Sequence, residues 1–258
     1  LQSLAALFVR AVLAMLAREP RRDPLVRHGA RLHDAFMLPA FLREDVAEIC
    51  CDLQAAGLDF DPRWFGPLFE QRFPVLGRLA AGEGEVLVRQ ALEPWPLLAE
   101  IADGGTTSRV VDNSTDRIEI SVSDPAALAG VRIVVNGVRL VLRDAGDVRV
   151  AGVRYKSADG WPAFHPHIPV QAPIQIALVD AMDTVIAASR YYFWNPDRPV
   201  YDSRPADLEE ALGRQRARWR SSDALRGTKL IPADPVYAEE STYTLDLRRQ
   251  TGAVRDLG

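Results

Sequence analysis

The hydrophobic period changes near residue 73 of this chain, and that change constrains the fold more than any other feature. Up to residue 72, apolar residues recur at helical spacing, as Val46, Ile49 and Leu53 do. From Phe73 to about Trp194, they alternate with polar residues at the period of 2 that is typical of strands. These strand-like runs follow one another without a helix between them. We therefore predict an α+β fold in which an N-terminal helical segment precedes an antiparallel β-sandwich.

Prolines and glycines predict where the helices begin and end. Glu19-Pro20 predicts the end of a first helix, because the residue before a proline avoids the α conformation. Pro39 predicts the start of a second helix, Gly57 predicts its end, and Asp61-Pro62 opens a short third helix. Residues 1–17 are apolar on nearly every side, which predicts a buried helix.

Turn residues indicate the main features of the strands. Asn136-Gly137 predicts a two-residue type I′ turn within a hairpin over residues 131–143. At Ala151-Gly152 the apolar alternation shifts by one residue, which suggests a β-bulge. A short strand is predicted over residues 243–247, where it would add to the edge of a sheet in this chain or in a neighbour.

The chain divides into three predicted regions. Residues 1–72 form the helical segment, which is a possible tail of an upstream domain, and residues 73–196 form the sandwich. Residues 197–258 hold a C-terminal helix over 205–220 and an extended tail. Acidic residues begin that helix and arginines end it, which complements the helix dipole. Its apolar edge, formed by Leu208, Leu212 and Trp219, is predicted to dock on the sandwich.

Composition excludes some classes of function. The formal net charge of −4 provides no basic surplus to neutralise phosphates, so we expect no nucleic-acid partner. No apolar run reaches the roughly 20 residues that span a bilayer, so we expect no membrane partner. Cys50 and Cys51 are adjacent and unsuited to a disulfide with each other, which favours a cytoplasmic location. The first residue is Leu rather than Met, which favours a fragment or a trimmed chain.

Two carboxylates at strand ends are the first candidates for chemistry. Glu93 and Asp112 would meet beside the indole of Trp95, as an acid/base pair or a cation site requires. The alternative is structural: Glu93 ends a strand, and Asp112 forms a side-chain-bonded turn with the residues after it. Under the functional interpretation, the candidate substrate-binding residues are Trp95, Asn113 and Arg117.

Histidines and cysteines provide weaker candidates. His165 and His167 would face the same way in an extended chain and could bind one metal, but a third ligand is missing nearby. His33 and Asp34 are catalytic candidates, because a carboxylate commonly orients a catalytic histidine; the alternative is an exposed loop pair. Cys50 lies in an apolar helical stripe, where a cysteine is ordinarily a small hydrophobic residue.

Several long motifs resemble the C-terminal region of the large bacterial transglutaminase-like proteins. They are Arg72-Phe-Pro-Val-Leu-Gly, Gln90-Ala-Leu-Glu-Pro-Trp, Val111-Asp-Asn-Ser-Thr-Asp-Arg-Ile, Ala151-Gly-Val-Arg-Tyr, His165-Pro-His-Ile-Pro-Val and Tyr201-Asp-Ser. The resemblance implies that a transglutaminase Cys-His-Asp core lies upstream and is absent here. It also implies that the first helices are the tail of a region similar to ATP-dependent carboxylate-amine ligases of the glutamine synthetase type.

This chain departs from the family's pattern at three positions. Ala35 and Ala40 stand where an arginine and a histidine are expected, and Pro96 stands where a histidine is expected after Trp95. These losses favour a non-catalytic C-terminal module that positions or assembles an upstream amide-bond enzyme or its peptide substrate. Its partners would be upstream domains or a separate catalytic subunit, and no cofactor is expected from this chain alone.

Two alternatives remain open from the sequence. In the first, the chain is part of an ATP-dependent carboxylate-amine ligase that uses Glu93 and Asp112 on Mg²⁺ or substrate. ATP and Mg²⁺ are expected only in that case, and these carboxylates should then share one pocket with His33 or His165. In the second, the chain is a carbohydrate- or protein-binding sandwich, which predicts an exposed row formed by Trp95, Trp161 and Trp194.

Overall fold

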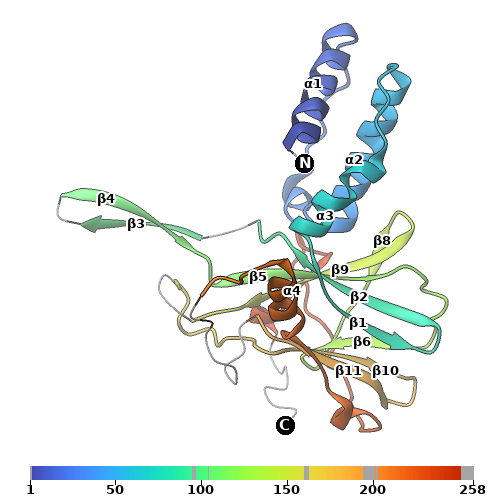
Figure 1. Ribbon diagram of the computed structural model, residues 1–258. Coiled ribbons are helices and arrows are strands. Elements are labelled where there is room, and N and C mark those ends of the chain that lie inside the picture. The colour runs from blue at the N-terminus through green and yellow to red at the C-terminus, as the bar shows by residue number, and fades with distance from the viewer. Residues whose placement is uncertain are drawn as a thin grey trace.

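Three helices form a segment that rises from one face of a β-sandwich (Figure 1). The computed structural model describes residues 2–94, 97–103, 105–159, 163–193, 201 and 203–250. The helices are α1 (Gln2–Arg18), α2 (Pro39–Ala55) and α3 (Gly66–Arg72), with 3₁₀-helices η1 (Gly29–Leu32) and η2 (Pro62–Phe65) between them. None of the helices in these described residues is long and apolar enough to cross a membrane.

The predicted helix ends are confirmed. Helix α1 ends before Pro20, and α2 begins at Pro39. Gly57 follows α2 with a φ of +80°, a conformation that glycine adopts without a steric cost. The side chain of Asp61 accepts the backbone N–H of Arg63 and so caps η2.

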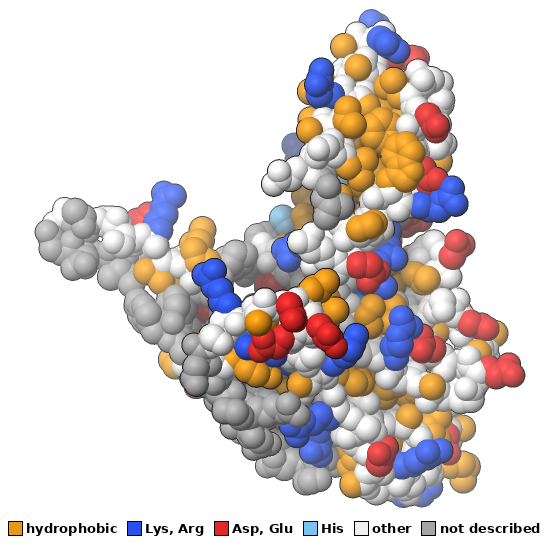
Figure 2. All heavy atoms as spheres, in the orientation of Figure 1, with side chains coloured by type: hydrophobic (Ala, Val, Ile, Leu, Met, Phe, Trp, Pro, Cys, Tyr) orange, Lys and Arg blue, Asp and Glu red, His pale blue; other side chains and the backbone are white. Residues whose placement is uncertain are grey.

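Helix α1 is more exposed than its apolar sequence predicts. Its inner face packs on a small core that includes Cys50, Leu53, Phe60 and Phe65, but none of its own residues is buried. Figure 2 shows hydrophobic side chains on the surface of this helical segment, and 62% of Leu13 is exposed. The prediction of a buried helix is therefore wrong. The helix packs on one side only, while its sequence is apolar on nearly all sides.

Within the part of the chain that the structure describes, the strands form two sheets and one separate hairpin. Sheet A has the order β1-β2-β5-β9-β13, with β8 also paired to β9, and sheet C has the order β12-β11-β10-β6-β7. Strands β3 and β4 form a hairpin that extends away from the sandwich (Figure 1). The bounds are β1 Val75–Ala81, β2 Gly84–Ala91, β3 Leu97–Asp103, β4 Thr106–Asp112, β5 Thr115–Val122, β6 Arg132–Val135, β7 Val138–Arg139, β8 Arg143–Ala145, β9 Val148–Lys156, β10 Ile174–Val179, β11 Val185–Tyr191, β12 Trp219–Ser221 and β13 Thr244–Asp246.

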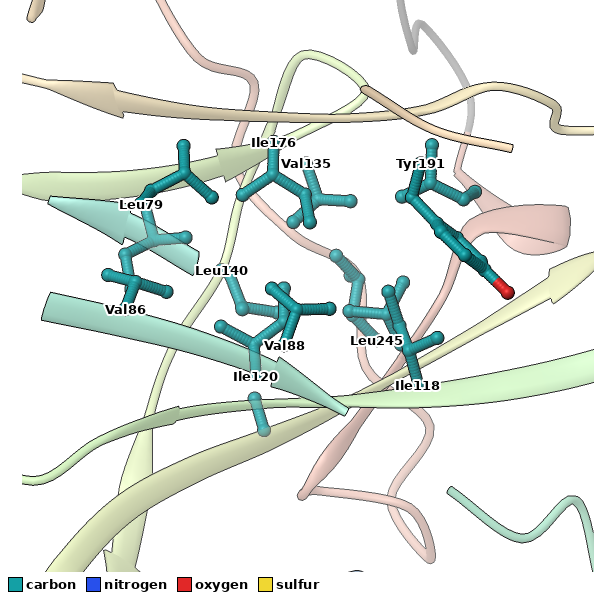
Figure 3. Packing of buried hydrophobic residues seen from close by; sticks show 14 of the residues in the cluster. Leu79, Val86, Val88, Ile118, Ile120, Val135, Leu140, Ile176, Tyr191 and Leu245 are labelled. Carbon is teal, nitrogen blue, oxygen red and sulfur yellow. The ribbon is translucent and has the colours of Figure 1, made fainter. Parts of the chain in front are cut away.

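The main core lies between sheets A and C. Every second residue of a strand points to the same face, so alternate apolar residues of both sheets meet there (Figure 3). Val88 and Ile118 come from sheet A, and Val135 and Ile176 come from sheet C. The sandwich expected from the period of 2 is therefore present.

The predicted hairpin turn is confirmed, and the predicted bulge is wrong. Val135 pairs with Val138 around Asn136-Gly137, whose φ values of 46° and 81° are those of a type I′ turn. Strand β9 runs past Ala151-Gly152 in unbroken register with β5. The apolar alternation is lost there because both faces of β9 are buried, with side chains covered on the outer as well as the inner face.

Two predictions about the C-terminal part need correction. The last helix, α4, is Leu208–Arg216 rather than residues 205–220, and Leu208 is exposed rather than docked. Trp219 instead lies in β12 and covers Gly77, where an added Cβ would meet its ring at 1.9 Å. The predicted strand at 243–247 is β13, but it pairs with β9 in parallel, so sheet A is mixed rather than antiparallel.

Candidate functional site

The outer face of sheet A, which faces away from the core, carries charged side chains. Residues opposite each other on adjacent strands point to the same face, and Arg117 on β5 lies opposite Arg154 on β9. Asp246 on β13 lies beside Arg154, and Glu119 follows Arg117 by two residues on the same face. All four residues are buried. The helical segment meets the sandwich over this face, and Figure 2 shows acidic and basic side chains gathered along that junction.

Arg117 joins three distant segments beneath the helices. It is fully buried, its Nε donates to the Leu92 carbonyl at 2.6 Å, and its Nη1 donates to the Asp34 carbonyl at 3.0 Å. Nη1 also lies 3.3 Å from the hydroxyl of Thr244 on β13. Burial lowers the pKa of Arg117 to about 10, still far above neutrality, so the side chain is charged. The predicted substrate-binding candidate therefore holds the site's segments together.

Gly152 on β9 leaves room for the side chain of Arg117 and for the loop before α2. A Cβ at this position would lie 2.7 Å from Thr244 Oγ1 and 3.1 Å from Leu38 Cδ2, and it would also contact Arg117. The absence of a side chain lets Arg117 and the loop before α2 lie directly on β9. Glycine is required here for close packing.

A cavity of about 380 Å³ opens beside these residues, and we call it the Arg154 pocket. Arg154 Nε donates to Glu93 Oε2 at 2.6 Å, and their side chains are only 11% and 9% exposed. Arg248 binds Asp246 through two hydrogen bonds, of 2.9 and 2.8 Å. The pocket is lined by Ala30, Glu93, Leu97, Arg154, His165, Val236, Ala238, Glu240, Ser241, Thr244, Asp246, Arg248 and Arg249.

The structure brings Glu93 and His165 to this pocket but leaves Asp112 outside its lining. Asp112 is buried, and its two oxygens accept the N–H groups of Ser114 and Phe164, each at 2.8 Å. Burial raises the pKa of Asp112. The hydrogen bond with the Ser114 side chain, the two backbone N–H groups and the nearby His165 lower it by more, so the pKa falls below its usual value. The predicted side-chain-bonded turn is confirmed, and Asp112 fixes the loop that presents His165.

The His33-Asp34 pair is not the exposed loop that the sequence alternative described. Asp34 is only 2% exposed, and its Oδ2 accepts the N–H of Tyr243 at 2.8 Å. Its Oδ1 has no hydrogen-bond partner among the described residues. Asp34 thus ties the loop before α2 to the segment that leads into β13. His33 is partly buried, and neither residue lines the Arg154 pocket.

The remaining candidates occupy separate places. His165 and His167 are exposed, with ring centroids 5.6 Å apart, and no three His, Cys, Asp or Glu side chains of the described residues are arranged to hold a metal. Cys50 is packed in the helical core, where burial raises the pKa of its thiol, as expected of a small hydrophobic residue. Asn113 is exposed. Trp95, Trp161 and Trp194 lie outside the described residues.

Sequence reasoning missed Arg154, Asp246 and Arg248. A signal existed: Arg154 lies between Val153 and Tyr155, and Asp246 lies between Leu245 and Leu247. A charge within a buried strand requires a partner. The partner of Arg154 is Glu93, which lies 61 positions earlier, and the partner of Asp246 is Arg248, two positions later. Only the fold brings these two ion pairs into one cavity.

Comparison with known proteins adds a family. No curated protein and no solved structure matches the chain. A family model described as "Putative amidoligase enzyme (DUF2126)" matches residues 1–248, which is nearly the whole chain. The resemblance to transglutaminase-like proteins stays a prediction. The chain belongs to the DUF2126 family.

Proposed function

We propose that this chain forms part of an amide-forming ligase and that its Arg154 pocket binds the carboxylate group of a substrate. The observation that most supports this proposal is that the two terminal nitrogens of the Arg154 guanidinium are available to a ligand. Its Nε is bonded to Glu93, but its two terminal nitrogens have no hydrogen-bond partner among the described residues, and the side chain lines the cavity. A guanidinium held at one edge is pre-organised to bind a carboxylate through the other.

The other residues of the pocket suit the same ligand. Asp246 holds Arg248 in a fixed orientation, and Arg249 adds a more exposed guanidinium to the lining. Glu93 and Asp246 keep the isolated pocket from accumulating positive charge. A second anionic group would be repelled by these acids, so the pocket favours one carboxylate over a polyanion.

Glu93 and Asp112 do not fit a shared Mg²⁺ ion, because Asp112 lies outside the lining of the pocket. Glu93 is bonded to Arg154, and both oxygens of Asp112 are bonded to backbone N–H groups. Forming an amide from a carboxylate requires activation of that carboxylate, which ATP supplies in carboxylate-amine ligases. The pocket therefore supports a role in binding the substrate carboxylate, and we assign no activation step to Glu93 or Asp112.

This proposal keeps part of the accessory-module hypothesis. The two acids that the sequence singles out are held by other groups, so the chain would bind substrate while other parts of the natural protein supply the reacting groups. The partners we propose are accordingly upstream domains, such as the transglutaminase-like core that the sequence motifs suggest, or a separate catalytic subunit.

A hydroxamate assay tests the function. The natural protein is incubated with ATP, Mg²⁺ and hydroxylamine as the amine, together with a panel of amino acids and short peptides that carry carboxylates. A ligase forms a hydroxamate that depends on both ATP and the acid. Arg154→Lys should raise the KM for the acid by tenfold or more, since lysine lacks the planar fork. Absence of ATP-dependent hydroxamate with every acid in the panel would refute the proposal.

A further inference from the structure

A second cavity, of about 540 Å³, lies between α2 and the outer face of sheet A. We call it the Glu119 cavity, and it shares no lining residue with the Arg154 pocket. Its floor is formed by β2 and β5, and its walls come from α2 and the turn between β8 and β9.

The arginines of this cavity already have partners. Arg78 is paired with Glu85, and both Arg43 and Arg89 bind Glu70 at 3.0 Å. Three acids that line the cavity, Glu44, Glu119 and Asp147, form no ion pair with any described residue. Glu70 carries one charge for two arginines. The three arginines of the lining are nevertheless outnumbered by five carboxylates, which are Glu44, Glu85, Glu119 and Asp147 of the lining and Glu70 beside it. The group is therefore net negative when Glu119 is ionised, and a cation would complement it.

Glu119 is the most buried of these acids. It is 2% exposed, and its Oε2 accepts the N–H of Ala40 at 2.9 Å. Its Oε1 has no hydrogen-bond partner among the described residues. Burial raises the pKa of Glu119 to about 7 even though Arg89 and Arg43 lower it from a distance. A carboxylate that is out of water and has one unused oxygen gains most from a cation that donates hydrogen bonds.

The rest of the cavity suits an alkyl chain. Ala40, Ala47, Leu87 and Val148 provide apolar wall on both sides of the acids. At one end of the cavity, the side chain of Glu44 on α2 comes close to Gly146 in the β8–β9 turn. A Cβ built on Gly146 would lie 3.1 Å from Glu44 Oε1. An alkyl chain with one charged end fits this combination of apolar wall and a buried acid.

We propose that the Glu119 cavity binds a primary ammonium group carried on an alkyl chain, such as a lysine side chain or an alkyl diamine, with Glu119 Oε1 as its anchor. The binding itself follows from the cavity. Its further identification as the site of the amine substrate rests on the proposed ligase function, in which a carboxylate and an amine must both be bound.

Isothermal titration of the natural protein with pentylamine tests the binding, with 1-pentanol as a neutral ligand of similar length. Pentylammonium should bind and pentanol should not, because the anchor recognises charge. Glu119→Gln should weaken binding by about 10-fold or more, the usual loss for a hydrogen bond to a charged group. Glutamine can still accept the Ala40 N–H, so α2 keeps its contact. Glu83→Gln removes an equal charge from the exposed β1–β2 turn and should leave binding unchanged.

The wild-type protein alone provides a second readout. At pH 7 the amine is fully protonated, since its pKa is near 10, whereas Glu119 is partly protonated. A bound cation favours the ionised carboxylate, so binding should release a fraction of a proton, seen as a heat that varies with the ionisation enthalpy of the buffer. The proposal is overturned if the wild type does not bind pentylamine, if it binds pentanol as tightly, or if a folded Glu119→Gln variant binds pentylamine as tightly as the wild type. No turnover is measured, so failure of the hydroxamate assay would leave this result standing.

Discussion

Glu119 on β5 accepts the backbone N–H of Ala40, the second residue of α2, at 2.9 Å. This bond joins the start of a helix to a carboxylate on the outer face of sheet A, where the positive end of the helix dipole favours negative charge. Two further contacts join the same segments, because Arg117 donates to the Asp34 carbonyl and Asp34 accepts the N–H of Tyr243. The helical segment is therefore fixed to the sandwich through buried polar groups as well as apolar contacts.

Stability should depend on pH through Glu119. Its pKa is raised from 4.5 to about 7, so its contribution to stability is fully present below about pH 4.5 and is lost as pH rises through 7. Glutamine does not titrate, so Glu119→Gln should remove this loss of stability and make the free energy of unfolding depend less on pH. The difference in unfolding free energy between variant and wild type should shift by about 3 kcal/mol in favour of the variant from pH 4.5 to 7.5.

Urea unfolding at several pH values measures this difference. Asp116 has a pKa raised to about 6 and titrates in the same direction, but it is present in both proteins and cancels in the comparison. A difference that stays constant across this pH range would show that Glu119 has an ordinary pKa in the folded protein.

Gly152→Ala should destabilise the protein by about 1–3 kcal/mol, because the new Cβ overpacks the contact with Thr244 and Leu38. The matched control is Gly213→Ala in α4, where nothing lies within 4 Å and alanine favours the helix. Thermal unfolding of both variants provides the comparison. Equal effects of the two changes would mean that β9 is not in close contact with the loop before α2.

Leu38→Ala should cost about 2–5 kcal/mol, the usual range for truncating a buried leucine. Leu38 is 0% exposed and packs with Ala91 and Val150 under the helical segment. Leu208→Ala makes the same chemical change at a residue that is 74% exposed, and its effect should lie within about 0.5 kcal/mol. Chemical denaturation measures both. A loss of stability for Leu38→Ala as small as that for Leu208→Ala would contradict the burial of this loop.

Local signals allowed much of the fold to be predicted from the sequence. Asn136-Gly137, Pro39 and Asp61 act through their own backbone preferences, so the turn and the helix starts follow without knowledge of the rest of the chain. The change of hydrophobic period coincides with the change from helix to strand, because α3 ends at Arg72 and β1 begins at Val75.

The errors arose where distant contacts override local preference. The shift at Ala151-Gly152 looks like a bulge but results from burial of β9 on both faces. Helix α4 ends at Arg216 because Trp219 packs on Gly77 of β1, which is 142 positions earlier in the chain. The parallel pairing of β13 with β9 has no local signal either.

The candidate site was predictable only in part. Glu93 and His165 do line one cavity, as an active-site hypothesis requires. Asp112 was chosen for its place at a strand end, but its oxygens face backbone N–H groups. The guanidiniums that define the Arg154 pocket were not foreseen, because the sequence shows a charge among apolar residues but does not show which distant residue is its partner.

Carboxylate binding at Arg154 tests the central claim most directly. Isothermal titration measures the binding of glutamate to the natural protein, to Arg154→Lys and to Arg149→Lys. In the isotope-labelled natural protein, the NMR signal of the Arg154 side chain is followed during the same titration. Arg149 is a half-exposed arginine on the same strand, paired with Asp144 and outside the pocket lining. We predict that glutamate shifts the Arg154 signal, and that Arg154→Lys weakens binding at least tenfold while Arg149→Lys leaves it unchanged. Equal binding to all three folded proteins, or no shift of the Arg154 signal, would contradict the account.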